Sequence, residues 1–327
     1  MNKVISVIGA GAFGTALAAV LAREGRHKIN LLGRSPTQLK NIGGSRVNAQ
    51  SLPNSPLPVE LRYTTSPEAL LESHCVLFAI PAQAHASAAA EYQSYITERA
   101  LVVTCAKGID RVSSELLSSV LQQTLPSNEV AALSGPGFAV DLVQGLPTAM
   151  AIASSQTTAT YLAKLLSTST FRLYASSDAI GVQLGGAIKN VLAIACGIGE
   201  GAGLGDSARA AVISRGLAEM SRLIVAMGGK AETARGLSGL GDLVLTGTSM
   251  QSRNYRYGID IGKRVLPNEM CHALIEGAST APVAARLGRE NGVDLPIISS
   301  VADILAGNIS VREAIHSLMN RPITKEH

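Results

Sequence analysis

The feature that most constrains this chain is a glycine-rich turn near its amino end. Val4–Ile8 is a run of five mostly apolar residues, as expected for a strand buried on both faces. The pattern Gly9-x-Gly11-x-x-Gly14 follows, and residues 15–24 then carry apolar side chains at helical spacing. In such a pattern the first glycine permits a tight turn, the second lets a pyrophosphate approach and the third lets the helix lie close to the strand. The order of strand, turn and helix therefore favours dinucleotide binding over a purely structural turn.

Composition limits the class of protein. The 327 residues suffice for one large or two ordinary domains, and 46% hydrophobic with 16% charged residues indicates a buried core. The net charge of +4 comes from scattered basic residues and only 3% of residues are aromatic, so no nucleic-acid partner is expected. The amino end lacks a signal-peptide pattern, and the longest uncharged run, 142–163, contains Pro and polar residues. We expect a cytoplasmic protein without stable membrane insertion.

Cysteine and histidine give no sign of a metal site or of a disulfide. The four cysteines are far apart in apolar surroundings and include no Cys-x-x-Cys: Cys75, Cys105, Cys196 and Cys271. Free core thiols in a reducing compartment are the expected state. The six histidines show no ligand spacing, so no metal is predicted.

A second strand is predicted at residues 29–32, and Gly33-Arg34 follows it. NAD-type folds usually place an acidic residue at this point to bind the ribose hydroxyls. This chain has none there, and the Arg34 guanidinium suits a 2′-phosphate, which favours NADP(H), with NAD(H) as an alternative. A solvated, exposed Arg34 is the other interpretation. Ser35 and Gln38 have the spacing of a capping box for the next helix.

Strand-like and helix-like segments then alternate. Further strands are predicted at 59–64, 75–80, 101–105, 130–133, 148–153 and 171–174, and helices at 67–72, 113–123 and 156–166. This alternation predicts a Rossmann-type α/β domain, a parallel sheet with helices on both faces. Two of the strands end in segments that suit a ligand site: Ala106-Lys107-Gly108, and Gly135-Pro136-Gly137-Phe138-Ala139 after Ser134. Ligands bind at this edge of such sheets, and the alternative interpretations are a surface lysine and an ordinary loop.

The pattern changes at residues 176–178, where strand signals end and helices rich in small residues begin. We therefore predict a dinucleotide-binding domain over 1–177 and an all-helical substrate domain over 178–327, with Asp178 as the first helix cap. The small-residue helices suggest a homodimer. Another capping box is predicted at Ser310 and Glu313.

The first helix of the second half, predicted over 179–198, contains several glycines. Glycine weakens a helix, so close approach of another backbone or of a ligand is the expected reason. Gly185 and Lys189 are four residues apart, which places the lysine on a face cleared of bulk. A lysine in such an apolar helix suits a general base, and the alternative is a side chain that snorkels to solvent.

Two polar segments follow in the second half. Residues 236–244 are too rich in glycine for a simple connection, and they hold Asp242 in a rigid frame. Ser252, Arg253 and Asn254 follow Gln251 and include a guanidinium suited to a phosphate. Solvated loop side chains are the alternative for both segments.

Together these stretches resemble the bacterial NAD(P)-dependent glycerol-3-phosphate dehydrogenases. The matching stretches run in family order over nearly the whole chain: 9–14, 48–58 with Leu52-Pro53 and Leu57-Pro58, 106–108, 134–139, 180–190, 215–222, 239–246 and 251–254. The resemblance implies a Rossmann domain followed by a helical domain. It also implies reversible reduction of dihydroxyacetone phosphate to sn-glycerol 3-phosphate, a small phosphorylated substrate that feeds glycerophospholipid synthesis.

The resemblance assigns roles to individual positions. Lys189 matches the proton acceptor, and the matched substrate contacts are Lys107, Gly135, Gly137, Lys189, Asp242, Ser252, Arg253 and Asn254. The matched cofactor contacts, beside Gly9, Gly11 and Gly14, are Ala12, Phe13, Arg34, Lys107, Ala139, Arg253, Leu274 and Glu276. The family usually has Ser or Thr where this chain has Gly137, which removes a hydroxyl contact. Leu274 and Glu276 lie in a loosely matching region.

Two other functions compete with this interpretation. A dehydrogenase of 3-hydroxy acids can share this plan with a helix-borne lysine, and its anion site would bind a carboxylate. A non-catalytic NADPH-binding regulator would be expected to lack Lys189 or Asp242, and both are present.

Overall fold

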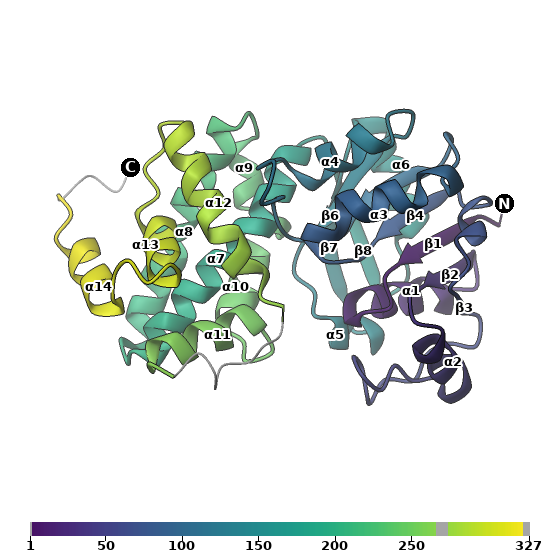
Figure 1. The fold of residues 1–327 in the computed structure, drawn as a ribbon, viewed down its shortest axis with the longest axis horizontal. Helices are drawn as coiled ribbons and strands as arrows, with labels where there is room; N and C mark the ends of the chain where they lie inside the picture. Colours follow the sequence, from purple (N-terminus) through teal and green to yellow (C-terminus); the bar gives the residue numbers. More distant parts are fainter. Residues whose placement is uncertain (1, 266–273, 323–327) are drawn as a thin grey trace. The chain divides into compact units, whose positions relative to one another are not determined.

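The computed structural model describes residues 2–265 and 274–322. The chain forms two compact units, residues 1–183 and 184–327, and most of their helices and strands are labelled in Figure 1. The division between the units lies inside one helix, α7 (Ala179–Gly201), a few residues after the boundary predicted between 177 and 178. Cys271 and its neighbours in 266–273 lie outside the described residues.

The first unit is built on an eight-stranded sheet with the strand order β3-β2-β1-β4-β5-β6-β7-β8. Its strands are β1 (Val4–Ile8), β2 (Lys28–Leu32), β3 (Arg62–Thr64), β4 (Cys75–Phe78), β5 (Leu101–Thr104), β6 (Val130–Ser134), β7 (Thr148–Ala153) and β8 (Phe171–Ser176). The first six are parallel and have the order of dinucleotide-binding folds. The glycine-rich turn follows β1, where the strand order reverses between β1 and β4.

The sequence predicts a parallel sheet, but the observed sheet is not parallel throughout. β7 is antiparallel to β6 and β8 is parallel to β7, so the last two strands run opposite to the other six. The helix between β6 and β7, α5 (Ala139–Val143), is five residues long and packs against α1 (Ala12–Arg23). It does not cross the sheet to start another parallel strand. Parallel neighbours need such a crossover, whereas antiparallel ones do not.

Among the predicted strands that are shorter than expected, the one over 59–64 loses the most residues. The strand predicted over 59–64 forms only at β3, and Val59 is 70% exposed. The Arg46 guanidinium donates to the backbone oxygens of Pro58 (3.2 Å) and Val59 (3.1 Å), which keeps this backbone out of the sheet.

Helices cover both faces of the sheet, as predicted. They are α1, α2 (Pro36–Ser45), η1 (Pro67–Leu70), η2 (Ala82–Ala84), α3 (His85–Tyr92), η3 (Gln93–Tyr95), α4 (Leu117–Thr124), α5 and α6 (Gln156–Leu166). Cys75 and Leu77 of β4 pack with α1, α5 and α6, whereas Val76 and Phe78 pack with α3 and α4. This alternation is the two-residue period of a strand buried on both faces.

The predicted helix caps form to different extents. At α2, Ser35 Oγ accepts from Gln38 N (3.2 Å), but the Gln38 side chain donates to Ala10 O, so only half of the capping box exists. Asp178 Oδ1 accepts from Gly181 N (2.9 Å) and caps α7. The box of Ser310 and Glu313 is complete.

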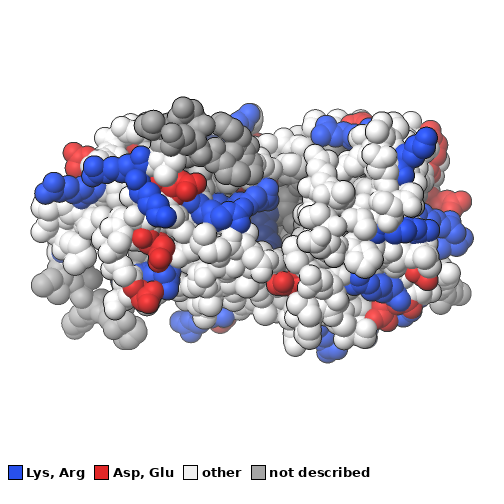
Figure 2. Space-filling model, turned by 90° about the horizontal axis from the view of Figure 1, so that it is seen from below, with Lys and Arg blue, Asp and Glu red and all other residues white. Residues whose placement is uncertain are grey.

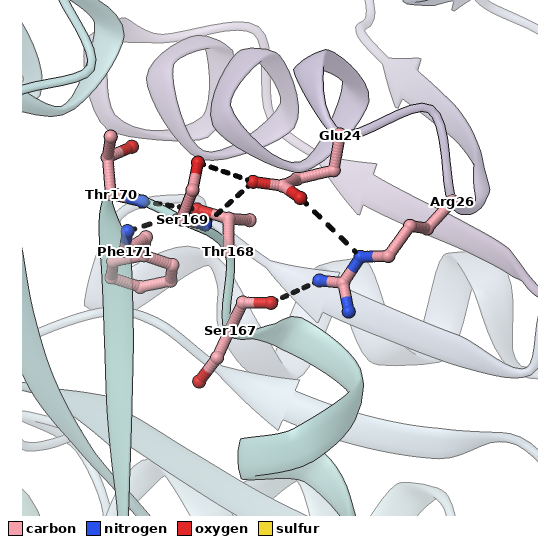
Figure 3. Close-up of polar contacts among 7 residues, drawn as sticks. All are labelled: Glu24, Arg26, Ser167, Thr168, Ser169, Thr170 and Phe171. Atoms are coloured by element: carbon pink, nitrogen blue, oxygen red, sulfur yellow. Dashed lines mark hydrogen bonds and ion pairs between the residues drawn. The ribbon is translucent and has the colours of Figure 1, made fainter.

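A polar cluster ties the end of α1 to the loop before β8 (Figure 3). Glu24 Oε1 accepts from Ser169 N (2.6 Å) and Ser169 Oγ (2.7 Å). Arg26 lies 3.8 Å from Glu24 Oε2 and donates to Ser167 O. The hydrogen bonds from Ser169 lower the pKa of Glu24, so its carboxylate is ionised at neutral pH.

The second unit is entirely helical in its described residues. It holds most of α7, then α8 (Gly205–Ala226), α9 (Ala231–Ala234), the π-helical turn η4 (Leu237–Gly241), α10 (Asp242–Gly247), α11 (Arg253–Gly262), α12 (Glu276–Glu290), α13 (Pro296–Leu305) and α14 (Val311–Met319). By length and composition α7 is the one described helix that could cross a membrane, but 89% of its apolar stretch is buried in the protein. It is therefore a core helix.

A buried acid joins α8 to α13. Glu219 accepts from Ile297 N (2.8 Å) and Ile298 N (3.1 Å), the amides that begin α13. Burial raises the pKa of Glu219 to about 7, against the opposite effect of these two bonds.

Three cysteines are free thiols in the core, as predicted: Cys75, Cys105 and Cys196. Burial raises the pKa of Cys75 and of Cys196 to about 12, and raises that of Cys105 as well. These thiols are therefore protonated and unreactive at neutral pH.

The glycines of α7 allow α11 to pack backbone to backbone against it. A Cβ on Gly197 would lie 2.1 Å from Tyr255 O, and one on Gly258 would lie 2.2 Å from Ile194 O. The same relation recurs one turn later at Gly201. Close approach of another backbone, the reason predicted for the glycines in this segment, is confirmed.

We expect Gly197→Ala to lower the free energy of unfolding by about 1–3 kcal/mol, as overpacking does, although alanine is the better helix former. Gly199→Ala in the same helix is the matched control, because its nearest neighbour would be Leu204 Cδ1 at 3.9 Å. That variant should be neutral or more stable by up to about 1 kcal/mol. Thermal unfolding followed by circular dichroism measures both, and equal midpoints would contradict the close helix contact.

Candidate active site

The glycine-rich turn of the first unit is determined by close contacts. Gly9 has φ +116°, and a Cβ there would lie 2.4 Å from Ala79 O, just beyond β4. A Cβ on Gly14 would lie 2.0 Å from Gly9 O. A Cβ on Gly11 would meet nothing within 4 Å, so this position opens onto free space. Two glycines thus shape the turn, and the third leaves room for a ligand to approach the backbone.

The first turn of α1 suits an anion. Ala12 and Phe13 begin the helix and are half-buried, and its first turn has no acidic residue. The N-cap residue is Gly11, which has no side chain that could accept hydrogen bonds from the first helix amides. The helix amides and the positive end of its dipole therefore face the open side of the turn.

Arg34 lies beyond the end of β2 and is exposed. No ion pair or hydrogen bond of Arg34 is found within the described ranges 2–265 and 274–322. Its guanidinium is therefore available at the carboxyl edge of the sheet, and the choice between 2′-phosphate contact and simple solvation stays open.

Lys107 and Gly135 meet at the ends of β5 and β6. Lys107 Nζ donates to Gly135 O at 2.7 Å, and the lysine is half-buried. Gly135 has φ +147°, and a Cβ there would lie 2.8 Å from Met150 Cα. Lys107 is therefore held in place by a backbone oxygen, although part of its side chain remains accessible.

At Gly137, where the resemblance leads us to expect Ser or Thr, the end of the Met150 side chain fills the neighbouring space. A Cβ at Gly137 would lie 2.5 Å from Met150 Cε and 3.1 Å from Thr148 Cγ2. Ala139 follows as the first residue of α5 and is half-buried against the core.

A buried histidine, not predicted from the sequence, links the ends of β4 and β5. His85 Nε2 lies 2.9 Å from Thr104 Oγ1, and Nδ1 lies 3.2 Å from Pro81 O. Burial lowers the pKa of His85 to about 4, so the ring is neutral at physiological pH. The Pro81 carbonyl only accepts, so Nδ1 carries the proton and Nε2 accepts from the Thr104 hydroxyl.

In the second unit, Lys189 belongs to a buried polar network. Its Nζ lies 2.9 Å from Asp242 Oδ1 and donates to Thr246 Oγ1 at 2.7 Å. Thr246 Oγ1 donates in turn to Asp242 Oδ1 at 3.0 Å. Lys189 is 5% exposed and Asp242 is 1% exposed, so the lysine does not snorkel to solvent.

Backbone contact positions this network. A Cβ on Gly185 would lie 3.1 Å from Ser238 O, so the turn η4 packs directly on α7 one helical turn before Lys189. Asp242 then begins α10. Thr246 was not predicted as a partner, although its spacing of four residues from Asp242 places both on one helix face.

The alternative interpretation of residues 251–254 as solvated loop side chains is wrong for Ser252 and Asn254. Ser252 caps α11, accepting from Tyr255 N at 3.2 Å, and is 2% exposed. Asn254 is also buried, and its Oδ1 accepts from Gly277 N (3.0 Å). Its Nδ2 donates to Asn190 Oδ1 (2.9 Å), a residue that sequence reasoning did not single out. Gln251 and Arg253 are exposed beside this cap.

The remaining predicted cofactor residues lie at the start of α12. Glu276 is its first residue and is half-buried, whereas Leu274 is 47% exposed. Gly277 approaches α7 so closely that a Cβ there would lie 2.6 Å from Asn190 O. The second unit thus gathers Lys189, its two partners, the α11 cap and the start of α12.

Charged side chains are spread widely on the surface. On the face in Figure 2, Lys and Arg side chains have Asp and Glu side chains among them. Among the residues that the structure describes, no group of three His, Cys, Asp or Glu side chains is placed to hold a metal ion.

A doubly wound sheet with this strand order and a Gly-x-Gly-x-x-Gly turn defines a dinucleotide-binding fold, and the buried Lys189 with its two polar partners suits proton transfer. Family models described as the N-terminus and C-terminus of NAD-dependent glycerol-3-phosphate dehydrogenase match residues 4–160 and 178–316. The chain belongs to this family.

Individual relatives agree over the full length. Glycerol-3-phosphate dehydrogenase (NAD(P)+) from Agrobacterium fabrum is 59% identical over 323 residues, which cover 98% of each chain. The enzyme of that name from Rhizobium etli is 54% identical over 327 residues, 100% of each chain. A crystal structure of glycerol-3-phosphate dehydrogenase from Coxiella burnetii is 36% identical and superposes with a TM-score of 0.92, covering 98% of this chain and 99% of that one.

Proposed function

We propose that this chain catalyses the reversible NAD(P)H-dependent reduction of dihydroxyacetone phosphate to sn-glycerol 3-phosphate. The buried network of Lys189, Asp242 and Thr246, in a chain of this family, is the observation that carries the proposal. The product supplies glycerophospholipid synthesis in the cytoplasm. The enzyme acts as a homodimer, with residues 1–177 as the cofactor domain and 178–327 as the substrate domain.

The first unit fits a nicotinamide dinucleotide. The open space at Gly11 and the acid-free start of α1 would accept its pyrophosphate, and the exposed Arg34 would accept a 2′-phosphate. The residues proposed to hold the cofactor are Gly9, Gly11, Ala12, Phe13, Gly14, Arg34, Lys107, Ala139, Arg253, Leu274 and Glu276. When bound, the nicotinamide supplies the hydride.

Lys189 handles the proton. In the reductive direction its ammonium donates a proton to the C2 oxygen as the carbonyl becomes an alkoxide. In the oxidative direction the neutral amine accepts that proton from the C2 hydroxyl. Asp242 and Thr246 hold Nζ at 2.9 and 2.7 Å, which fixes its direction. Because the ammonium is buried, its charge acts on a bound carbonyl with little screening by water.

The start of α11 supplies the phosphate site. Ser252, Arg253 and Asn254 lie at its N-terminus, where the helix dipole favours an anion. Arg253 is exposed and can contribute a bidentate contact. Asn254 already uses Oδ1 and one Nδ2 hydrogen, so it can offer a phosphate a single N–H. Lys107, Gly135 and Gly137 are the contacts proposed from the first unit.

Activity on a substrate panel tests this function. We expect NADPH oxidation, followed at 340 nm, with dihydroxyacetone phosphate and very little with unphosphorylated dihydroxyacetone, because the phosphate site would then be empty. Equal rates with both would contradict the phosphate site. A preference for keto acids would instead favour a hydroxy-acid dehydrogenase, and binding of NADPH without turnover of any substrate would favour a regulator.

Lys189→Met should lower kcat by roughly 10² to 10⁴, the usual contribution of general acid–base catalysis. Methionine keeps roughly the volume of the lysine side chain, so its effect is not one of lost packing. Lys189→Arg should lower kcat similarly, because guanidinium does not give up a proton near neutral pH. Single-turnover NADPH oxidation, with cofactor binding measured separately, reports the chemical step. Near-normal hydride transfer in the Met variant would assign the proton to another group.

Arg34→Asp should reduce or reverse a preference for NADPH over NADH, since a carboxylate repels a 2′-phosphate and suits free ribose hydroxyls. The measurement is the ratio of kcat/KM for the two cofactors. Lys40→Asp makes the same change of charge at an exposed position of α2 and should leave the ratio unchanged. An unchanged ratio in both variants would mean that Arg34 is only solvated.

A further inference from the structure

The segment between α2 and β3, which contains the family stretch 48–58, is folded tightly on itself. Arg46 ends α2 in the left-handed conformation, with φ +55°. Leu57 N donates to Arg46 O (2.7 Å), Val47 pairs with Pro56, and the Arg46 guanidinium holds Pro58 O at 3.2 Å. These contacts close the segment into a defined loop.

The two Leu-Pro pairs of this stretch anchor the loop in the core. Leu52 is 1% exposed and Leu57 is 5% exposed, and both belong to the cluster that includes α1 and α2. The loop therefore has a fixed position beside α1.

One side chain of this loop reaches the glycine-rich turn. Asn48 is 1% exposed, and its Nδ2 donates to Ala10 O (3.0 Å) and to Thr15 Oγ1 (2.9 Å). Ala10 lies inside the turn, and Thr15 lies in the first helical turn of α1, where its N–H donates to Gly11 O (2.9 Å). Gln38 Nε2 donates a further hydrogen bond to Ala10 O (3.2 Å). The Ala10 carbonyl only accepts, so the Asn48 amide must present its N–H groups to the turn.

We propose that Asn48 is a positioning residue for the cofactor, which holds the turn Gly9–Gly14 in its anion-binding shape before the dinucleotide arrives. The inference rests on the proposed function. Three glycines within six residues give this turn high conformational freedom when it is not held. Bonds to Ala10 O and to Thr15 span the turn from both sides of Gly11, so they remove this freedom in advance. Preorganisation of this kind lowers the entropic cost of binding.

The unused oxygen of Asn48 supports this role. Asn48 Oδ1 is buried and has no hydrogen-bond partner among the described residues. A buried acceptor without a partner lowers the stability of the folded protein, and an apolar residue of similar size would avoid this cost. The two donated bonds are therefore what the amide contributes at this position.

The test compares NADPH affinity, measured by fluorescence titration without substrate, with KM for dihydroxyacetone phosphate at saturating NADPH. Asn48→Asp is nearly isosteric but replaces both donors by an acceptor that faces Ala10 O. It should raise the Kd for NADPH about tenfold to a hundredfold. Once the enzyme is saturated with cofactor, kcat and KM for the substrate should stay near those of the wild type.

Thr15 provides a milder pair of variants. Thr15→Val removes the hydroxyl that accepts from Asn48 and should raise the Kd for NADPH by about three- to tenfold. Thr15→Ser keeps the hydroxyl and should restore wild-type affinity. If Asn48→Asp fails to fold, this pair carries the test.

Two controls separate positioning from stability. Asn41→Asp places the same new charge on the exposed face of α2, and Leu125→Ala weakens the core on the other face of the sheet. Both should leave the Kd unchanged, although Leu125→Ala lowers the melting temperature. A lower melting temperature with unchanged Kd in Asn48→Asp, or in Thr15→Val, would overturn the inference. A wild type that binds NADPH but does not reduce dihydroxyacetone phosphate would overturn only the proposed function, and one that does not bind NADPH would overturn both.

Discussion

Close contact between backbones, which is possible because glycine has no side chain, is the constraint on which both units depend. In the first unit, Gly9 lies against Ala79 O, and this contact sets the path of the chain from β1 into α1. In the second unit, the same kind of contact joins Gly185 to the η4 turn and Gly197 to α11. Such contacts are tighter than side-chain packing allows. They fix the directions of the helices that carry Lys189 and Asp242.

The buried network of Lys189 is better explained by chemistry than by stability. Moving a lysine and a carboxylate out of water costs several kcal/mol per ion, and their attraction often only balances that cost. Loss of one partner would leave an uncompensated buried charge, which typically costs about 3–5 kcal/mol. A well-packed hydrophobic pair in place of Lys189 and Asp242 would stabilise the contact between these helices at least equally. A fixed ammonium with two oriented partners is instead what proton transfer at a defined atom requires.

Much of the fold was predictable because its signals are local. Strand and helix periodicity gave the alternating first unit and the helical second one, and glycine spacing gave the turn after β1. The reversal of β7 and β8 was not predictable, since it depends on where α5 packs. Lys189 and Asp242 could be singled out from their surroundings in the sequence. Their contact with Thr246, and the burial of Ser252 and Asn254, depend on how separate helices meet.

The space beside Gly137 makes two positions dependent on each other. The end of the buried Met150 side chain occupies the volume that a serine or threonine at 137 would need. A serine or threonine at 137 would therefore require the flexible end of Met150 to turn aside, whereas a shorter residue at 150 beside Gly137 would leave a void. The cost of a change at either position therefore depends on the residue at the other, so the effects of substitutions at 137 and 150 should not be additive.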